Sequence, residues 1–152
     1  MARARIITDS TAYLTPDQIA QHEITVLPVD IHLGDQKIRV SSDHNLKELF
    51  QRMAADQAQT AKAVIPPSVF EDAYSQLGRQ TDQILVTVSS SKLSSAFAAA
   101  KSVANAFLGR CRIAVLDSLA TSWGLGLLVK AAAEAAEAGQ SLDEIVRLVR
   151  GM

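Results

Sequence analysis

Hydrophobic and polar positions alternate along the chain in two ways. Short runs of mostly β-branched residues end in Asp, Ser or Gly, and longer stretches between them carry apolar residues at helical spacing. The short runs predict strands at residues 5–9, 84–88 and 113–116. Residues 25–33 are also rich in β-branched side chains, but Pro28 cannot donate to a strand ladder, which predicts an edge strand or an interruption. Strands that alternate with helices predict an α/β fold, with a Rossmann-like parallel sheet and helices on both faces.

Helix-start signals precede several of the longer stretches. Thr15 is followed by Pro16 and Gln18, which predicts a capping box with a proline in the first turn. This helix is expected to end near residue 22, and long helices are expected at residues 94–107 and 123–138. A capping side chain with glutamate three residues later predicts three further starts: Asn45, Ser68 and Ser141.

Two segments need partners that the local pattern does not identify. Gly34 and Asp35 form a turn signal, after which the chain is expected to return as a short hairpin arm. The last helix carries an apolar face that requires cover from a second lobe, another subunit or the body of the domain. The residues of this face are Leu142, Ile145, Val146 and Val149.

The composition narrows the class of protein. The 152 residues fit a single domain, and 48% hydrophobic with 20% charged residues is ordinary for a globular protein. A formal net charge of -1 disfavours a nucleic-acid partner, which would require a basic face. No run of about 18 apolar residues predicts a transmembrane segment, and the apolar stretch after Arg5 is too short for a signal peptide. A cytoplasmic location is therefore expected.

Several kinds of chemistry lack the residues that they need. The three histidines are scattered without paired ligand spacing, so no metal site is predicted. Gly124 and Gly126 form a lone G-x-G beyond the end of a strand, which does not predict a dinucleotide cofactor. Arg110 and Arg112 could lower the pKa of Cys111, but no base accompanies this thiol, and we interpret it as structural. Neither catalysis nor a cofactor is predicted.

Polar segments follow three of the expected strands, where ligands bind in open parallel α/β sheets. Residues 89–95 contain five serines and a lysine before a helix. One N-cap explains one serine, and the remaining hydroxyls with the free N–H groups would suit a carboxylate or a phosphate. Residues 8–11 either hold an anion or satisfy donors of their own turn. In residues 117–122, Asp117 either supports the serine segment, contacts a ligand or only ends its strand.

Four motifs, in order along the chain, resemble the DegV family of bacterial proteins. They read ITDSTAYL, VLPVDIHLGDQKIR, VTVSSSKLSSAFAAA and VLDSLATSWGLG. The resemblance covers essentially the whole chain and implies a DegV-type N-terminal α/β lobe. It also implies a fatty acid ligand whose carboxylate is held by hydroxyls and whose tail lies in an apolar channel. The family does no chemistry itself, and some members present the fatty acid to a separate fatty acid kinase.

The resemblance implies the residues of the site as well. Ser91 and Ser94 are the expected carboxylate contacts, and Ser90 comes next. Other residues would shape the floor of the site at the strand ends: Thr8, Asp9, Ser10 and Asp117.

The chain departs from the family pattern at three points. The family's Thr-Ser-Gln segment falls on about Lys62, Ala63 and Val64, where the threonine hydroxyl is lost and Lys62 could supply a charge instead. Its Gly-Thr pair is replaced by Ser95 and Ala96. Family members are also nearly twice as long, so we expect one lobe over residues 1–152 without the second. Apolar surface left uncovered tends to recruit a partner, which predicts a homodimer or another protein as cover.

Two alternative functions stay open from the sequence. A serine-rich loop between a strand and a helix also resembles the phosphosugar-binding loop of sugar isomerase domains. Such an enzyme needs a Glu or His base near the loop, and the sequence does not place one. The other alternative is an interaction lobe that binds no small ligand.

Overall fold

A four-stranded parallel sheet forms the centre of the molecule. The computed structural model describes residues 3–33, 36–40, 46–55 and 61–152. The strand order β2-β1-β6-β7 is parallel throughout. The strands are β1 (Arg5–Asp9), β2 (Thr25–Leu27), β6 (Gln83–Val88) and β7 (Arg112–Asp117).

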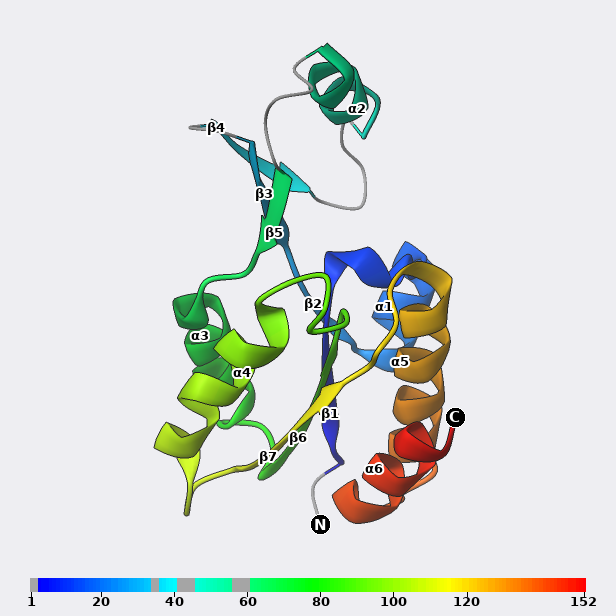
Figure 1. Cartoon of the computed structure of the whole chain (residues 1–152). Helices are drawn as coiled ribbons and strands as arrows, with labels where there is room; N and C mark the ends of the chain where they lie inside the picture. Colours follow the sequence, from blue (N-terminus) through cyan, green and yellow to red (C-terminus); the bar gives the residue numbers. More distant parts are fainter. Residues whose placement is uncertain (1–2, 34–35, 41–45, 56–60) are drawn as a thin grey trace.

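Helices cover both faces of this sheet, as the sequence predicts (Figure 1). One face packs against α3 (Pro67–Leu77) and α4 (Ala96–Ala104), and the other against α5 (Ser122–Glu137) and α6 (Leu142–Gly151). The short helix α1 (Pro16–His22) lies beside α5.

Alternation along β1 decides which side chain enters which core. Ile7 is fully buried in the cluster with α3 and α4, whereas Ile6 is buried in the cluster with α5 and α6. Successive side chains of a strand point to opposite faces, so a strand covered on both faces has apolar residues at consecutive positions. This explains why the sequence of β6 is apolar at nearly every position.

A second, smaller sheet has the order β4-β3-β5 and is antiparallel. It consists of β3 (Val29–Leu33), β4 (Gln36–Val40) and β5 (Ala61–Val64), and α2 (Leu46–Ala55) lies between β4 and β5 in the chain. Pro28 separates β2 from β3, which confirms the predicted interruption. The hairpin arm is confirmed as β4, while its turn at Gly34 and Asp35 lies outside the described residues. The sequence pattern did not predict β5.

The predicted helix starts are confirmed at Thr15 and Ser141, where both hydrogen bonds of each capping box are present. The predicted start at Ser68 is wrong, because α3 begins at Pro67 with Pro66 at the N-cap. Proline fixes φ at a helical value and has no N–H to leave unpaired, so it takes the first position before the serine does. The predicted start at Asn45 lies outside the described residues.

Two further helical expectations change in detail. The stretch predicted at residues 94–107 forms α4 and then a separate 3-10 turn, Asn105–Phe107. The apolar face of α6 packs on the body of the domain, with Leu142, Ile145 and Val149 all buried in the cluster with α5. Of the three possible partners for this face, the domain itself provides the cover.

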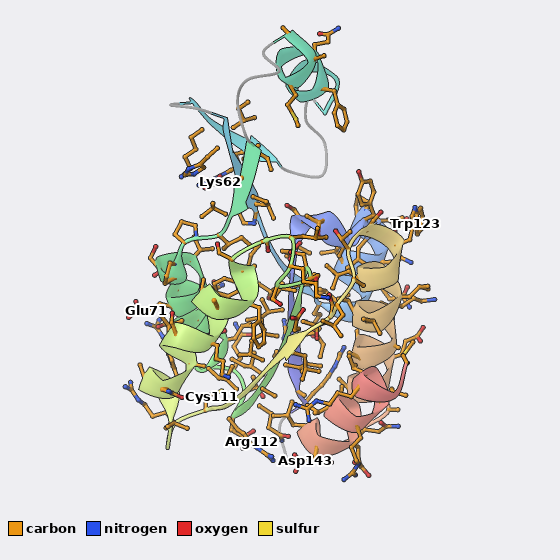
Figure 2. The ribbon with its side chains drawn as sticks, in the orientation of Figure 1. Lys62, Glu71, Cys111, Arg112, Trp123 and Asp143 are labelled. Atoms are coloured by element: carbon orange, nitrogen blue, oxygen red, sulfur yellow. The ribbon has the colours of Figure 1, made fainter. Side chains whose placement is uncertain are left out.

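Cys111 is a buried thiol, which fits its interpretation as structural. Burial together with the negative charge of Asp82 raises its pKa. Arg112, one of the two arginines that could have lowered this pKa, forms an ion pair with Asp143 on α6 instead (Figure 2).

Candidate functional site

The three polar segments predicted at strand ends meet in the structure. The amide of Ser89, after β6, donates to Asp9 Oδ2 at the end of β1 over 2.7 Å. The amide of Ser91 donates to Asp117 Oδ1 at the end of β7 over 3.1 Å. The Ser90 amide donates to the carbonyl of Ala120, in the loop that follows β7, over 2.8 Å. Residues 89–95, which we call the serine loop, are thus held from both sides.

Asp9 is the internal support of this arrangement. Its side chain is fully buried, and its Oδ1 accepts from the amide and the hydroxyl of Thr11 at 2.9 and 2.6 Å. Together with the Ser89 amide, three donors surround one carboxylate, which satisfies a buried anion without a cation. Ser10 Oγ accepts from the Val29 amide at 3.0 Å. Asp9 and Ser10 therefore hold backbone groups, and Asp9 lies beneath the surface of the site.

Asp117 supports the loop from the opposite side. Its Oδ1 accepts from the amides of Ser91 and Leu119, both at 3.1 Å. Burial alone would raise the pKa of Asp117, but hydrogen bonds from Ser91 and Leu119 and the charge of Lys92 outweigh it and hold this pKa below its usual value. Asp117 thus holds backbone N–H groups of the serine loop and of its own turn, and support of the loop is one of the roles that the sequence left open for it.

The serines differ in what their hydroxyls can reach. Ser89 and Ser90 are buried, Ser94 is half-buried, and Ser91 and Ser95 are exposed. The Ser89 and Ser94 hydroxyls lie 2.9 Å apart, and Ser94 Oγ also accepts from the amide of Ala96 at the start of α4. Ser90 Oγ accepts from the Lys92 amide at 3.3 Å. Ser91 and Ser95 are thus the exposed serines of the loop, and the Ser91 side chain also hydrogen-bonds to Asp117.

The small sheet reaches this loop through β5. Ala63 forms an isolated parallel bridge with Ser94, so the segment that replaces the family's Thr-Ser-Gln lies against the predicted contact residue. Lys62 is exposed and, since neighbours in a strand point to opposite faces, it lies on the face opposite Ala63. In the register of the small sheet Lys62 pairs with His32. Figure 2 shows Lys62 on the small sheet, well apart from Trp123 on α5.

Sequence reasoning included the residues that join the loops in its polar segments but assigned them no individual role. Thr11 links to Thr121 through their hydroxyls at 3.3 Å, and Ala120 accepts from the Ser90 amide. The only signal for them in the sequence is that each follows a strand end by a few residues. Thr8, which was expected in the floor of the site, is fully buried at the end of β1.

The described residues contain no candidate metal centre: no group of three or more His, Cys, Asp or Glu side chains within them could bind a metal ion. His22 contacts Glu137 at 2.9 Å, and both carboxylates at the serine loop, Asp9 and Asp117, are engaged by backbone amides. Among the helices of the described part, none is both long and apolar enough to cross a membrane.

Comparison with known proteins places these observations in a family. The family model described as "Uncharacterised protein, DegV family" matches residues 3–152. A DegV domain-containing protein of Deinococcus radiodurans is 32% identical over 142 residues, which cover 93% of this chain and 50% of the relative. The chain spans about half the length of the curated relatives it matches.

Solved structures share the fold. One, described as showing fatty acid binding of a DegV family protein from Thermus thermophilus, has a TM-score of 0.83 at 27% identity and is matched over 97% of this chain and 52% of that chain. The Fatty Acid Kinase (Fak) B3 protein of Streptococcus pneumoniae, loaded with linoleic acid, has a TM-score of 0.80 at 22% identity, over 99% and 54%. The parallel sheet, the serine loop at its strand ends and a family match over nearly every residue lead to one conclusion: this chain belongs to the DegV family.

Proposed function

We propose that this chain binds the carboxylate of a long-chain fatty acid at the serine loop. The observation that carries the proposal is the position of this loop, between a buried strand and the start of α4 and fixed by Asp9 and Asp117. The T. thermophilus relative described as binding fatty acid supports the class of ligand, since it has this fold at 27% identity.

The head group is expected to meet hydroxyls and amides rather than a cation. We expect the exposed Ser91 hydroxyl to exchange its hydrogen bond with Asp117 for one to the ligand carboxylate, and the Ser94 hydroxyl, half-buried beside Ala63, to donate to the same carboxylate. The free N–H groups in the first turn of α4 add a favourable partial positive charge. Ser95 lies at the N-cap of α4 without a side-chain cap bond, which leaves its hydroxyl available for the ligand. Lys62 is expected to contribute little, because it lies on the opposite face of β5.

The acyl tail is expected to cover apolar side chains that are exposed to solvent near the strand ends. We call these residues the apolar rim: Tyr13, Leu93, Leu119 and Trp123, which are 54–73% exposed. Tyr13 and Leu119 adopt left-handed backbone conformations, with φ of 51° and 52°. Such strain in bulky residues clusters at functional sites. The rim is therefore a candidate for the tail channel and for the surface that a second lobe or a second copy of the chain would cover.

The proposed role is binding, not catalysis. The two carboxylates at the loop accept hydrogen bonds from its backbone amides, which gives them a structural role in this proposal. We further propose that the bound fatty acid is presented to a separate kinase. This part of the proposal rests on the fold shared with the Fak B3 protein.

Native mass spectrometry, before and after solvent extraction, tests the ligand. We expect a released mass that matches a long-chain fatty acid, or uptake of added oleate by the extracted protein. The Ser91→Ala and Ser94→Ala variants should each weaken oleate binding by about tenfold, the value of one hydrogen bond to a charged group. Ser102→Ala is the matched control, because Ser102 lies in α4 but its hydroxyl donates to Ala99 O within the helix.

Other outcomes would contradict the proposal in different ways. Failure to take up oleate, with intact folding by circular dichroism, would exclude fatty acid binding by this chain on its own. Equal oleate affinities for all three serine variants would show that the head group binds outside the serine loop. Turnover of a sugar phosphate that is lost in Ser94→Ala would favour the isomerase alternative instead.

A further inference from the structure

Two threonine hydroxyls in the central sheet are buried with no hydrogen-bond partner among the described residues. Thr8 in β1 and Thr87 in β6 are both fully buried. Neither Oγ1 atom has a hydrogen-bond partner in the part of the chain that the structure describes. An unpaired buried hydroxyl destabilises the native state, and buried hydroxyls without a hydrogen-bond partner are rare in folded proteins. The two side chains therefore need a polar neighbour.

The register of the sheet puts these two residues side by side. β1 and β6 are parallel, with Ile6 opposite Leu85 and Ile7 opposite Val86, and one further step along both strands brings Thr8 opposite Thr87. By alternation Thr8 shares the face of Ile6, and Thr87 shares the face of Leu85. Both Ile6 and Leu85 belong to the cluster that α5 covers. The hydroxyls thus lie on the same face, under α5.

We propose that Thr8 and Thr87 together bind one internal water molecule. Neighbouring strands are about 4.8 Å apart, and a water held at about 2.8 Å from each hydroxyl spans that distance. Internal waters usually have two to four polar partners, and a pair of facing hydroxyls provides the first two. A threonine hydroxyl can donate and accept, so either orientation of the water can be satisfied.

The proposed water lies directly behind the candidate site. Thr8 precedes Asp9, and Thr87 comes two residues before Ser89. The Ser89 amide donates a hydrogen bond to the Asp9 carboxylate. The water would therefore join the two strands one residue below the bond that holds the serine loop. The proposal concerns the interior of the sheet and stands independently of the identity of the ligand.

Valine substitutions test the proposal, because valine keeps the shape of threonine and removes only the hydroxyl. Thr8→Val and Thr87→Val should each raise the unfolding equilibrium constant about tenfold, because the water is lost and the remaining hydroxyl stays unpaired. The double variant should unfold no more readily than either single variant, since it leaves no unpaired hydroxyl. Urea titrations of the four proteins measure this cycle. A high-resolution crystal structure should show an oxygen within about 3.2 Å of both Oγ1 atoms.

Two results would overturn the proposal. Stability changes that simply add in the double variant would mean that the two hydroxyls do not share a partner. A crystal structure in which both hydroxyls bond to main-chain carbonyls, with no water between them, would assign them local roles instead.

Discussion

Asp9 and Asp117 hold the backbone of the serine loop by accepting hydrogen bonds from its amides. Each carboxylate also accepts a hydrogen bond from a backbone N–H of its own turn, Thr11 for Asp9 and Leu119 for Asp117. A loop fixed at two amides keeps its hydroxyls in one geometry, which lowers the entropy cost of ligand binding. At the scale of the residue, the site is therefore organised by acceptors that lie behind it.

Removal of the Asp117 charge should have an effect that depends on pH. The pKa of Asp117 lies below its ordinary value of 3.8, so the charged form stabilises the folded state above that value, and the contribution is lost as pH falls through the folded-state pKa. We expect Asp117→Asn to be less stable than the parent protein at pH 7, with the difference shrinking below about pH 4. Thermal unfolding across this range measures it.

Asp72→Asn provides the control for this experiment, because Asp72 is an exposed aspartate on α3. Its stability should follow that of the parent protein over the whole range. A difference for Asp117→Asn that stays constant from pH 7 down to about pH 3 would show that the charge of Asp117 is not what stabilises the loop.

At the scale of the element, α5 packs unusually closely on the segment after β1. The 3-10 turn Ser10–Ala12 lies against α5 at Gly126, where an added Cβ would come within 2.4 Å of the Ala12 carbonyl oxygen. A glycine in mid-helix costs up to about 1 kcal/mol relative to alanine, and the close approach explains why it is tolerated. Gly126, the second glycine of the lone G-x-G, thus allows close packing of α5 on this turn.

Gly126→Ala should therefore destabilise the protein despite the better helix propensity of alanine. We expect a loss of about 1–3 kcal/mol, because backbone on both sides has to move to admit the methyl group. Gly151→Ala is the comparison, since an added Cβ there meets no described atom within 4 Å. Chemical denaturation measures both, and a Gly126→Ala variant as stable as the parent would mean that α5 can shift without cost.

At the scale of the whole molecule, the two ends of the parallel sheet differ in character. The carboxyl ends carry the serine loop and the apolar rim. The amino ends carry ion pairs that join the start of β1 to neighbouring elements, with Arg3 bonded to Glu137 at 3.0 Å and Arg5 bonded to Glu23 at 2.8 Å. These ion pairs connect the start of β1 to its neighbours, and the apolar rim lies exposed near the carboxyl ends. We expect a ligand or partner at the carboxyl ends to cover this rim.

Trp123 offers a direct test of cover at the apolar rim, because it is the single tryptophan of the chain and is 70% exposed. Its fluorescence in the extracted protein should be that of a solvated indole. If the acyl tail covers the rim, oleate should shift the emission of the parent protein to shorter wavelength. In Ser94→Ala, about tenfold more oleate should be needed for the same shift. A saturated protein with unchanged emission would place the tail elsewhere.

The local sequence determined most of the secondary structure. Strand β1, the cap at Thr15 and the cap at Ser141 were all predicted, because alternation and capping act within a few residues. The parallel sheet with helices on both faces followed from the order of these elements. Pro66 and Pro67 at the start of α3 outweighed Ser68 for a reason that is also local. Among the starts that the described residues test, it is the one that the capping pattern misplaced.

The tertiary structure decided what depends on contacts between distant residues. Strand β5 has only four residues, and it exists as a strand because it pairs with β3. The bond from Ser89 to Asp9 joins residues 80 positions apart, and no periodicity encodes it. The sequence named the polar segments that end the strands, but only the folded chain determined which hydroxyls face outward, because burial is a property of the assembled core.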